Sequence, residues 1–316
     1  MNKHSYLIVA HNNFEQLKLL LTLIDDERND IFLFVDKKSS AQFHKENLKV
    51  IRSHLHINSP FQISWGGYSQ CRATLFLLRE ALKQGEYTYF HLLSGVDLPL
   101  HGQDYIHDFF EKYDGYEFLA YVGKELYEKN RPEERLKYYY LFQDAGIRNP
   151  LLKKIVTKIG NDVFVRIQKV FGVNRLTKLG KIQIGYGTNW FSITSAFAKY
   201  ILREENKIER IYRNSLCCDE IFIHTLALNS EFKDRIFVME GLHDKKEDRQ
   251  GSLRYINWWD GNPKVWTMED KDELLEARDR GYLFSRKFDE RKDKEIIAYI
   301  SEMVKNEREY VITDRL

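Results

Sequence analysis

Two adjacent carboxylates, Asp219 and Glu220, stand directly before an apolar run in the segment CCDEIFIHTLALNS. A carboxylate beside apolar side chains is suited to accept a proton in general-base catalysis. Asp219 can cap a helix that reaches about Leu228, and Glu220 then falls in the first helical turn. The alternative is that Glu220 only complements the dipole of that helix.

Two cations lie among aromatic residues, where they could neutralise a phosphate group. Arg254 lies in LRYINWW and Lys287 lies in LFSRKFD. Partial dehydration by neighbouring rings strengthens the attraction between a cation and phosphate oxygens. The alternative is that both are surface cations whose aliphatic stems cover apolar neighbours.

Common nucleotide and metal motifs are missing from the sequence. No GxGxxG follows the first predicted strand, and no GxxxxGK[ST] occurs, which disfavours a dinucleotide site and excludes a P-loop. One DxD occurs at Asp270–Asp272, but it lies in a polar stretch with no strand before it. We therefore predict no metal site and no cofactor, so that Arg254 and Lys287 must meet any leaving phosphate.

The elements that must position these residues alternate between short apolar runs and amphipathic stretches. Strands are predicted at Tyr6–Ala10, Ile31–Val35, Tyr87–Leu93 and Tyr116–Ala120. This alternation predicts an α/β fold with a Rossmann-like, mostly parallel central sheet flanked by helices. Ligands of such sheets bind outside the carboxyl ends of the strands.

Candidate ligand-contacting residues follow three of these strands. Ala10 and His11 lie at the end of the first, Asp36 follows the second, and Asp97 lies in SGVDLP after the third. Gly95 in that loop allows another chain segment to approach its backbone closely. We therefore predict that Asp97 lies at the carboxyl edge of the sheet and points at a ligand.

Aromatic residues next to glycine turns offer flat apolar faces for a sugar ring. Trp65 lies in WGGYS, and Thr188, Asn189 and Trp190 lie in GYGTNWF. Each segment taken alone also fits an ordinary turn that packs on a core.

The composition limits the class of protein. The 316 residues are 43% hydrophobic and carry a formal net charge of only +2, which gives no strong field for binding nucleic acid. Three cysteines without zinc-ligand spacing, Cys71, Cys217 and Cys218, favour a reducing compartment and no structural zinc. No stretch has about 18 consecutive apolar residues and none resembles a signal peptide, so we expect a cytoplasmic protein without a transmembrane helix.

Residues 121–183 differ in character from the rest of the chain. Between 151 and 180, seven basic residues accompany a single acidic residue, Asp162, and apolar residues recur at helical spacing. The pattern fits an amphipathic helix on an anionic membrane surface or, more commonly, a helix that packs on the core with a solvated basic face. We predict one domain over residues 1–316, with a basic helical insertion at about 121–183 and a C-terminal helix at about 290–306.

Several of these segments occur together in one order: WGGYS, LLSGVDLPL, GTNWF, the CDE segment, LRYINWW and LFSRKFD. In this combination the sequence resembles the core-2/I-branching β-1,6-N-acetylglucosaminyltransferase family, which also contains the peptide O-xylosyltransferases. The resemblance extends from about Tyr6 to Asp289 and leaves residues 121–183 unmatched. No segment of the sequence resembles the membrane anchor or the disulfide cysteines of the animal Golgi members, so we expect a compact bacterial relative.

The resemblance implies a GT-A-type fold and an inverting, metal-independent glycosyltransferase with a UDP-sugar as co-substrate. The catalytic base of the family falls on Glu220, and the cations that replace a metal at the diphosphate fall on Arg254 and Lys287. The uridine-contacting Asp falls on Asp36 in FVDKK, where Phe34 replaces the family's His.

The remaining site residues follow from the same resemblance. Ala10 and His11 are expected beside Asp36 at the nucleoside. Cys217–Cys218 replaces the Ser-Pro that often precedes the Asp-Glu pair, which leaves the shape of that loop open. The sugar and acceptor pocket is expected to contain Trp65, Asp97, Thr188, Asn189, Trp190 and Asp219.

The expected partners are a UDP-sugar, first of all UDP-N-acetylglucosamine, and a glycan or lipid-linked glycan acceptor in cell-surface polysaccharide synthesis. We also expect peripheral contact with the inner membrane face, and no nucleic acid. Three alternatives stay open: a different donor such as UDP-xylose, a metal-dependent transferase that holds Mn²⁺ on Asp97 or Asp270, and a non-catalytic carbohydrate-binding protein.

Overall fold

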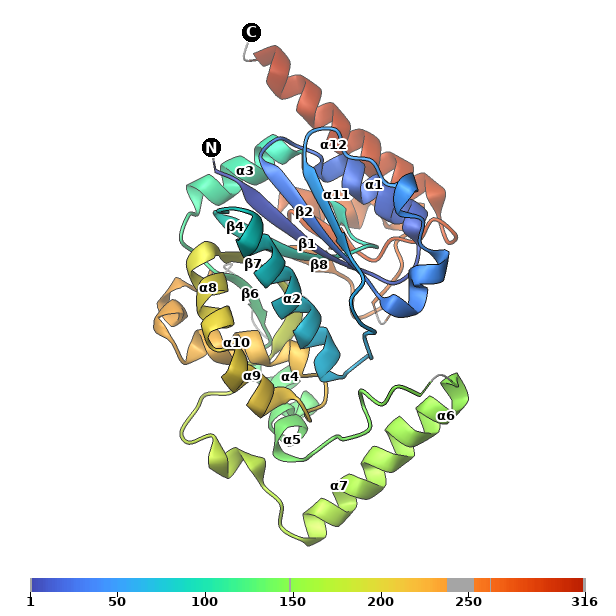
Figure 1. Cartoon of the computed structure of the whole chain (residues 1–316). Helices are drawn as coiled ribbons and strands as arrows, with labels where there is room; N and C mark the ends of the chain where they lie inside the picture. The colour runs from blue at the N-terminus through green and yellow to red at the C-terminus, as the bar shows by residue number, and fades with distance from the viewer. Residues whose placement is uncertain (1, 148, 238–252, 262, 315–316) are drawn as a thin grey trace.

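A six-stranded sheet with the spatial order β3-β2-β1-β4-β7-β6 forms the centre of the molecule (Figure 1). The structure is a computed structural model and describes residues 2–147, 149–237, 253–261 and 263–314. β1 to β4 run parallel, whereas β7 is antiparallel to its neighbours β4 and β6. The strands are β1 (His4–Ala10), β2 (Asn29–Val35), β3 (His54–Asn58), β4 (Tyr89–Ser94), β6 (Phe118–Tyr121) and β7 (Gly187–Thr194).

Helices cover both faces of this sheet because the side chains of each strand alternate between two apolar cores. Tyr6 and Ile8 of β1 belong to one core, and Leu7 belongs to the other. The first core includes α1 (Phe14–Ile24), α3 (Gln103–Lys112), α11 (Lys271–Asp279) and α12 (Lys294–Asp314). The second includes α2 (Tyr68–Gln84), α8 (Ser195–Arg203), α9 (Glu205–Tyr212) and α10 (Phe222–Leu228). The predicted α/β fold with a mostly parallel sheet is confirmed.

A second sheet of three short strands, in the order β5-β9-β8, begins just after β4. Its strands are β5 (Leu98–Pro99), β8 (Arg254–Ile256) and β9 (Phe284–Arg286). The backbone N–H of Phe288 donates to the carbonyl of Val96 at 3.0 Å, so the chain after β9 lies against the SGVD loop. The small sheet therefore brings Arg254 and Arg286 to the region where β4 ends.

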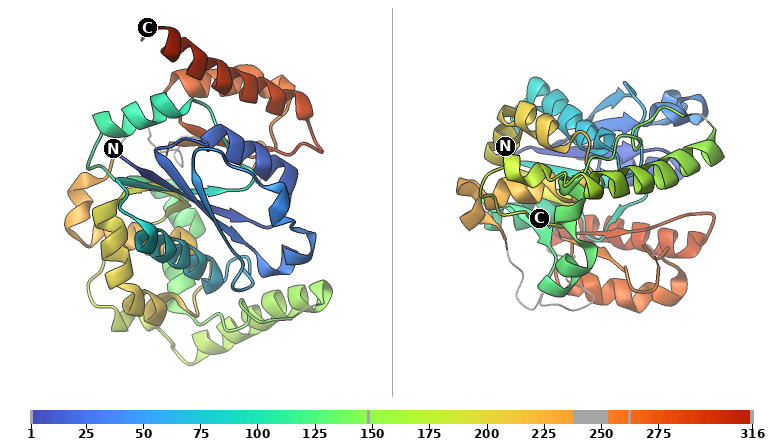
Figure 2. Two further views of the ribbon diagram at one scale, coloured as in Figure 1. Left: turned by 45° about the horizontal axis from the view of Figure 1, so that its top comes forward. Right: turned by 90° about the horizontal axis from the view of Figure 1, so that it is seen from below.

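The segment that the family resemblance leaves unmatched is helical. It contains α4 (Lys124–Asn130), α5 (Pro132–Lys137), α6 (Pro150–Ile155), the π-helical turn η3 (Val156–Gly160), α7 (Asn161–Val170) and the 3-10 turn η4 (Arg175–Lys178). Figures 1 and 2 show α6 and α7 as one rod at the periphery of the molecule, away from the central sheet. None of the helices in the described part of the chain is both long enough and apolar enough to cross a bilayer.

The C-terminal helix begins later and extends further than predicted. α12 starts at Lys294 because the Asp293 carboxylate accepts from the N–H groups of Glu295 and Ile296, at 2.8 and 3.1 Å, as a helix cap does. The remaining 3-10 turns are η1 (Lys37–Gln42), η2 (Lys45–Asn47), η5 (Cys218–Glu220), η6 (Glu231–Arg235) and η7 (Met268–Asp270).

The order of the strands locates a ligand crevice. From β1 the chain adds β2 and β3 on one side, and then crosses to place β4 on the other side. In open α/β sheets, ligands bind outside the carboxyl ends of the strands at such a reversal. The ends of β1 and β4 are therefore the place to look for a site.

Candidate active site

The ends of β1 and β4 approach each other closely. A Cβ built on Gly95, just after β4, would lie 3.1 Å from the Cβ of Ala10, the last residue of β1. The Ala10 carbonyl accepts from the Asp36 N–H at 2.9 Å, which ties the end of β2 to the same place. The three loops predicted to face a ligand therefore meet at one edge of the sheet.

The predicted nucleoside residues gather with a cationic group at this edge. The Asp36 carboxylate is 4% exposed and accepts from the N–H groups of Lys38 and Ile63, at 3.0 and 3.3 Å. Partial burial lowers the pKa of His11; the charge of Asp36 opposes this shift, whereas the nearby charges of Lys287 and Lys38 reinforce it. His11 therefore lies within electrostatic range of both Asp36 and Lys287, which come from other parts of the sequence.

A buried ion pair joins the SGVD loop to β9. Asp97 is 0% exposed, and its carboxylate accepts from the N–H and the hydroxyl of Ser94, at 2.9 and 2.5 Å. The Arg286 Nη1 lies 3.6 Å from Asp97 Oδ1, and its guanidinium lies over the Trp190 ring at 4.3 Å. Burial raises the pKa of Asp97, and the charge of Arg286 opposes that shift. Arg286 therefore connects two residues predicted to bind sugar.

Arg254 lies in an unexpected environment for a phosphate-binding cation. It is 0% exposed, and its guanidinium donates to Ser192 Oγ at 2.8 Å and to the Phe191 carbonyl at 2.6 Å. Burial lowers its pKa to about 9, although the charge of Asp97 favours the cation. The interpretation of Arg254 as a surface cation is wrong, and direct contact with a diphosphate stays a prediction.

Glu220 does not lie in the first turn of a helix, so that part of the prediction is wrong. Asp219 and Glu220 belong to the 3-10 turn η5, and α10 begins only at Phe222. The Glu220 Oε2 accepts from Arg135 Nη1 at 2.7 Å, and the Arg135 guanidinium lies 5.1 Å from the centre of the Tyr186 ring. Burial alone would lower the pKa of Arg135. The interactions with Tyr186 and Glu220 have a larger combined effect, so the pKa of Arg135 is raised. Glu220 is therefore held by a cation, just before the start of α10.

The WGGYS loop and the Asp-Glu turn are in contact although they are distant in sequence. Gln70, which follows WGGYS, donates from Nε2 to Asp219 Oδ2 at 2.9 Å and accepts from the Gly66 N–H at 2.5 Å. The Gly66 carbonyl in turn accepts from the Cys217 N–H at 2.8 Å. Cys217 has a φ of 46°, in the left-handed region that residues other than glycine rarely adopt. The loop that carries the two cysteines is thus tightly turned just before the Asp-Glu pair.

The buried carboxyl of Asp219 predicts a pH-dependent stability. Burial, assisted by the charge of Glu220, raises the pKa of Asp219. The folded chain then binds this proton more tightly than the unfolded chain, so stability falls as the pH rises above the ordinary carboxyl range. Asp219→Asn is expected to be more stable than the wild type at about pH 8, and the difference is expected to shrink as the pH falls towards about 4.

Chemical unfolding at several pH values measures this difference. The exposed Asp162 provides the control, because Asp162→Asn is expected to leave the pH profile unchanged. A stability difference between Asp219→Asn and the wild type that stays constant from about pH 4 to about pH 8 would contradict the effect of burial on Asp219.

The other predicted sugar-binding residues differ in burial and do not all lie in one part of the site. Thr188 is 4% exposed, and its hydroxyl has no hydrogen-bond partner among the described residues. Asn189 is half-buried, and Trp190 is buried under Arg286. Trp65 is 78% exposed, and its backbone carbonyl accepts from Gln143 Nε2 at 2.7 Å. Trp65 is therefore a surface residue beside the Asp-Glu turn, whereas Trp190 belongs to the region around Asp97.

Four residues that the sequence did not single out belong to these groups: Gln70, Arg135, Arg286 and Lys38. Arg286 lies within LFSRKFD, Lys38 lies within FVDKK, and Gln70 directly follows WGGYS, so the sequence signal was the motif itself or its edge. Arg135 lies in the segment 121–183, which carries no recognised motif, so nothing local marked it.

The first aspartate of the DxD, Asp270, serves the local structure. The Asp270 carboxylate pairs with Lys264 Nζ at 2.5 Å and accepts from the backbone and hydroxyl of Thr267, both at 3.0 Å. Within the described ranges, no three His, Cys, Asp or Glu side chains gather as a metal site would require. Asp270 therefore offers no support for the metal-dependent alternative.

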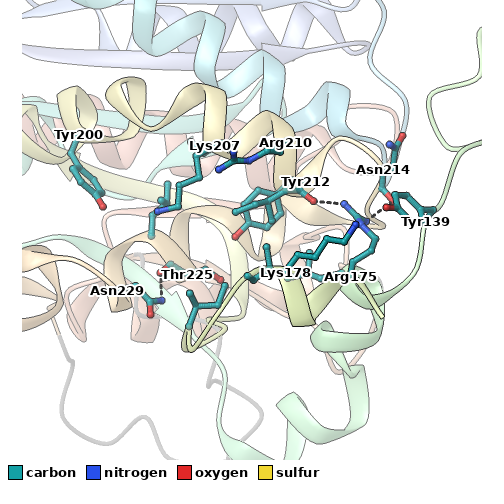
Figure 3. Close-up of a pocket in the computed structure, with 16 residues that line it drawn as sticks. Tyr139, Arg175, Lys178, Tyr200, Lys207, Arg210, Tyr212, Asn214, Thr225 and Asn229 are labelled. Atoms are coloured by element: carbon teal, nitrogen blue, oxygen red, sulfur yellow. Dashed lines mark hydrogen bonds between the residues drawn. The ribbon is translucent and has the colours of Figure 1, made fainter. Parts of the chain in front are cut away.

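A separate pocket of about 580 Å³ lies between η4, α9 and α10 (Figure 3). None of the predicted site residues lines it. Its cations are Arg175, Lys178, Lys207 and Arg210. Arg175 donates to the carbonyls of Ile211 and Asn214, at 2.5 and 3.2 Å, and Lys207 pairs with Glu204 at 3.1 Å. Two of the four cations are therefore engaged within the protein.

Comparison with known proteins identifies the family. The sequence model described as Branch: Core-2/I-Branching enzyme matches residues 5–273, and the chain belongs to this family. Its mostly parallel sheet with helices on both faces agrees with the GT-A-type fold implied by the resemblance.

Curated relatives carry the name xylosyltransferase. Xylosyltransferase sqv-6 of Caenorhabditis elegans is 25% identical over 292 residues, which cover 88% of this chain and 33% of that protein. Xylosyltransferase 2 of Rattus norvegicus is 22% identical over 317 aligned positions, which cover 94% and 33%. The chain thus spans about a third of the length of these relatives.

Solved structures show only low similarity. S. aureus TarS 1-349 in complex with UDP-GlcNAc is 15% identical, with a TM-score of 0.26 over 38% of this chain and 34% of that chain. Mouse xyloside xylosyltransferase 1 in its apo form is 8% identical, with a TM-score of 0.37 over 90% and 97%. Neither similarity is high enough to support an argument about function.

Proposed function

We propose that this chain is an inverting, metal-independent glycosyltransferase that moves a sugar from a UDP-sugar to a glycan hydroxyl. The observation that carries the proposal is the Asp219–Glu220 turn, which packs against β7 with the Glu220 carboxylate 2.7 Å from Arg135. β7 also carries Trp190, which connects through Arg286 to Asp97 at the end of β4. Family membership supports the same activity.

Glu220 is the proposed base of a single displacement. Its Oε2 pairs with Arg135, so Oε1 is the oxygen that can accept the proton of an acceptor hydroxyl. That hydroxyl oxygen bonds to the anomeric carbon as the bond from this carbon to the diphosphate oxygen breaks, which inverts the configuration. Arg135 is a positioning residue, because it orients the carboxylate without touching the reacting atoms.

Lys287 is the proposed cation for the leaving diphosphate. It is half-buried, and its charge acts on His11, one of the predicted nucleoside residues, so a nucleotide bound there would bring its phosphates within reach. A fixed cation at a leaving group stabilises the charge that develops in the transition state. Arg254 has a supporting role in the proposal. Its buried guanidinium donates hydrogen bonds to Phe191 and Ser192 of β7, and its positive charge stabilises the Asp97 carboxylate.

The donor sugar and the acceptor are the finer part of the proposal. UDP-N-acetylglucosamine is the first candidate, with Asp97, Thr188, Asn189 and Trp190 around the sugar. UDP-xylose is the second candidate, and the names of the curated relatives favour it. The proposed acceptor is a glycan or lipid-linked glycan of a cell-surface polysaccharide, which a peripheral membrane contact would bring within reach.

Lys287→Ala is expected to weaken UDP binding about tenfold or more, because a charge-assisted contact to phosphate is lost. Isothermal titration calorimetry with UDP in the presence of EDTA measures this. Lys292→Ala, which removes an exposed lysine five residues further along, is the control and is expected to bind as the wild type does. Unchanged affinity of Lys287→Ala would reject the proposed role of Lys287.

The same titration separates a transferase from a carbohydrate-binding protein. A module that binds only glycans needs aromatic platforms and has no use for a nucleoside diphosphate. Wild-type protein that binds glycans but shows no affinity for UDP would therefore favour the non-catalytic alternative.

A further inference from the structure

The helical rod formed by α6, η3 and α7, here called the arm (residues 150–171), presents an unusual face to solvent. Figure 2 shows it at the edge of the molecule in two further orientations. The described residues include thirteen exposed large hydrophobic side chains, and eight of them lie on the arm. They are Leu151, Leu152, Ile155, Ile159, Val163, Ile167, Val170 and Phe171.

Polar contacts hold the inner side of the arm to the body. Gln168 exchanges two hydrogen bonds with the backbone of Tyr139, at 2.8 and 2.9 Å. Asn161 donates to the Gln143 side chain at 3.1 Å, and Lys153 Nζ donates to Ser64 Oγ at 2.9 Å. Arg175, just beyond the arm, donates to the α9 carbonyl of Ile211. The arm is therefore fixed at several points, and its burial pattern is reversed from that of an ordinary packed helix.

The exposed aliphatic residues form a continuous row. Five of them follow one another at intervals of four, from Leu151 to Ile167. In an α-helix each such step rotates the row by about 40°. The π-helical turn Val156–Gly160 has more residues per turn than an α-helix, so it rotates the row in the opposite direction. The two rotations offset each other, and the row stays on one side of the arm. An apolar row that the fold maintains in water indicates a partner for this face.

The charges beside this row identify the kind of partner. Lys154, Lys158, Arg166 and Lys169 are exposed, and the sole acidic residue of the arm is Asp162. Two copies of this face packed on each other would bring like charges together, which disfavours self-association. Apolar side chains flanked by lysine and arginine are the pattern of helices that lie in the interface of an anionic bilayer.

We propose that the outer face of the arm binds anionic lipid bilayers, with its aliphatic row among the upper acyl chains and its cations on the headgroups. The arm starts beside the loop that contacts Asp219, since Lys153 bonds to Ser64 and Gln70 bonds to Asp219. Membrane binding would therefore hold the Asp-Glu turn near the bilayer surface. The inference rests on the arm alone and holds whether or not the proposed transferase activity does.

Flotation with lipid vesicles tests the inference. The probes are vesicles of phosphatidylcholine alone and vesicles with about one third phosphatidylglycerol, at about 0.1 M salt, where surface charges act over about 10 Å. The wild type is expected to bind the anionic vesicles at least about tenfold more tightly than the neutral ones. Equal binding to both, or binding to neither, would overturn the proposal.

Two sets of variants separate the apolar row from the cations. The triple variant Ile155→Ser, Ile159→Ser, Val163→Ser is expected to lose binding at least about tenfold, because apolar burial drives insertion. Lys154→Glu with Lys158→Glu is expected to lose at least about twentyfold on anionic vesicles, since each basic residue near such a surface contributes about fivefold. Ile51→Ser, at a side chain 93% exposed elsewhere on the molecule, is the control and should bind normally.

Light scattering of the same variants checks the competing explanation. If the apolar row instead buries itself in a dimer, the wild type is dimeric, the triple variant is monomeric and neither floats with vesicles; that result would reject membrane binding. Unchanged thermal unfolding temperatures show that the variants are folded, because the substituted side chains are exposed or half-exposed. Folded variants that still bind anionic vesicles as the wild type does would also reject the proposal.

Discussion

Glu220→Gln is expected to lower the turnover number by about 10²–10⁴-fold, the usual contribution of a positioned general base. Glutamine keeps the size of the side chain and an oxygen for Arg135 Nη1, which lies 2.7 Å from the carboxylate, but it cannot take the acceptor proton. UDP affinity should stay within about twofold, because Glu220 meets the acceptor and not the phosphates. Steady-state kinetics and UDP titration together measure both quantities.

Glu125→Gln supplies the matched control, since Glu125 is exposed on α4 and lies outside the proposed site. It should turn over as the wild type does. Near-normal turnover of Glu220→Gln would reject the assignment of the base. A loss of UDP binding together with turnover would instead indicate that Glu220 acts through the fold of the site.

Arg254→Met is expected to destabilise the protein by about 3–5 kcal/mol, the range for removing one partner from a buried charge network. The methionine fills much of the space, but the Phe191 carbonyl and Ser192 hydroxyl lose their donor at 2.6 and 2.8 Å. Asp97, which is 0% exposed, also loses part of its compensating charge. Equilibrium unfolding in urea measures the change in the free energy of unfolding.

Arg52→Met is the control for this effect, because Arg52 is exposed and its backbone N–H, not its side chain, bonds to Asp25. A stability of Arg254→Met equal to that of the wild type would contradict the structural role of Arg254. Loss of UDP affinity with unchanged stability would favour the direct phosphate contact implied by the family resemblance.

The position of the site at the sheet edge could be predicted because it depends on local patterns. Buried strands appear as short apolar runs, and parallel strands bring their carboxyl ends to one edge. This reasoning correctly placed Ala10, Asp36 and Asp97 near one another. The α/β class followed from the same alternation of runs.

Contacts between distant segments could not be predicted in the same way. The partner of Glu220 is Arg135, 85 positions away, and neither side chain has a local pattern that selects the other. Gln70 and Asp219 are 149 positions apart. The predicted start of α10 was also wrong, because the 3-10 turn Cys218–Glu220 comes first and the N-cap position of α10 falls on Ile221, not on Asp219.

The aromatic neighbours of Arg254 predicted partial dehydration, but no sequence signal predicted its complete burial. Successive side chains of a strand point to opposite faces of the sheet. When the residues on one face are apolar and buried, a charged residue between them is normally expected to face solvent. β8 is short, and all three of its residues are buried, because the small sheet is covered on both faces. For the arm, the helical spacing was evident, but only the structure shows that its polar side faces the body.

The most direct test of the proposed activity is UDP release from a panel of UDP-sugars, measured with and without EDTA in the presence of a glycan acceptor. We expect release from UDP-N-acetylglucosamine or UDP-xylose that is unaffected by EDTA, since Lys287 and the neighbouring cations replace a metal. Release that EDTA abolishes and Mn²⁺ restores would contradict metal-independent transfer by this chain.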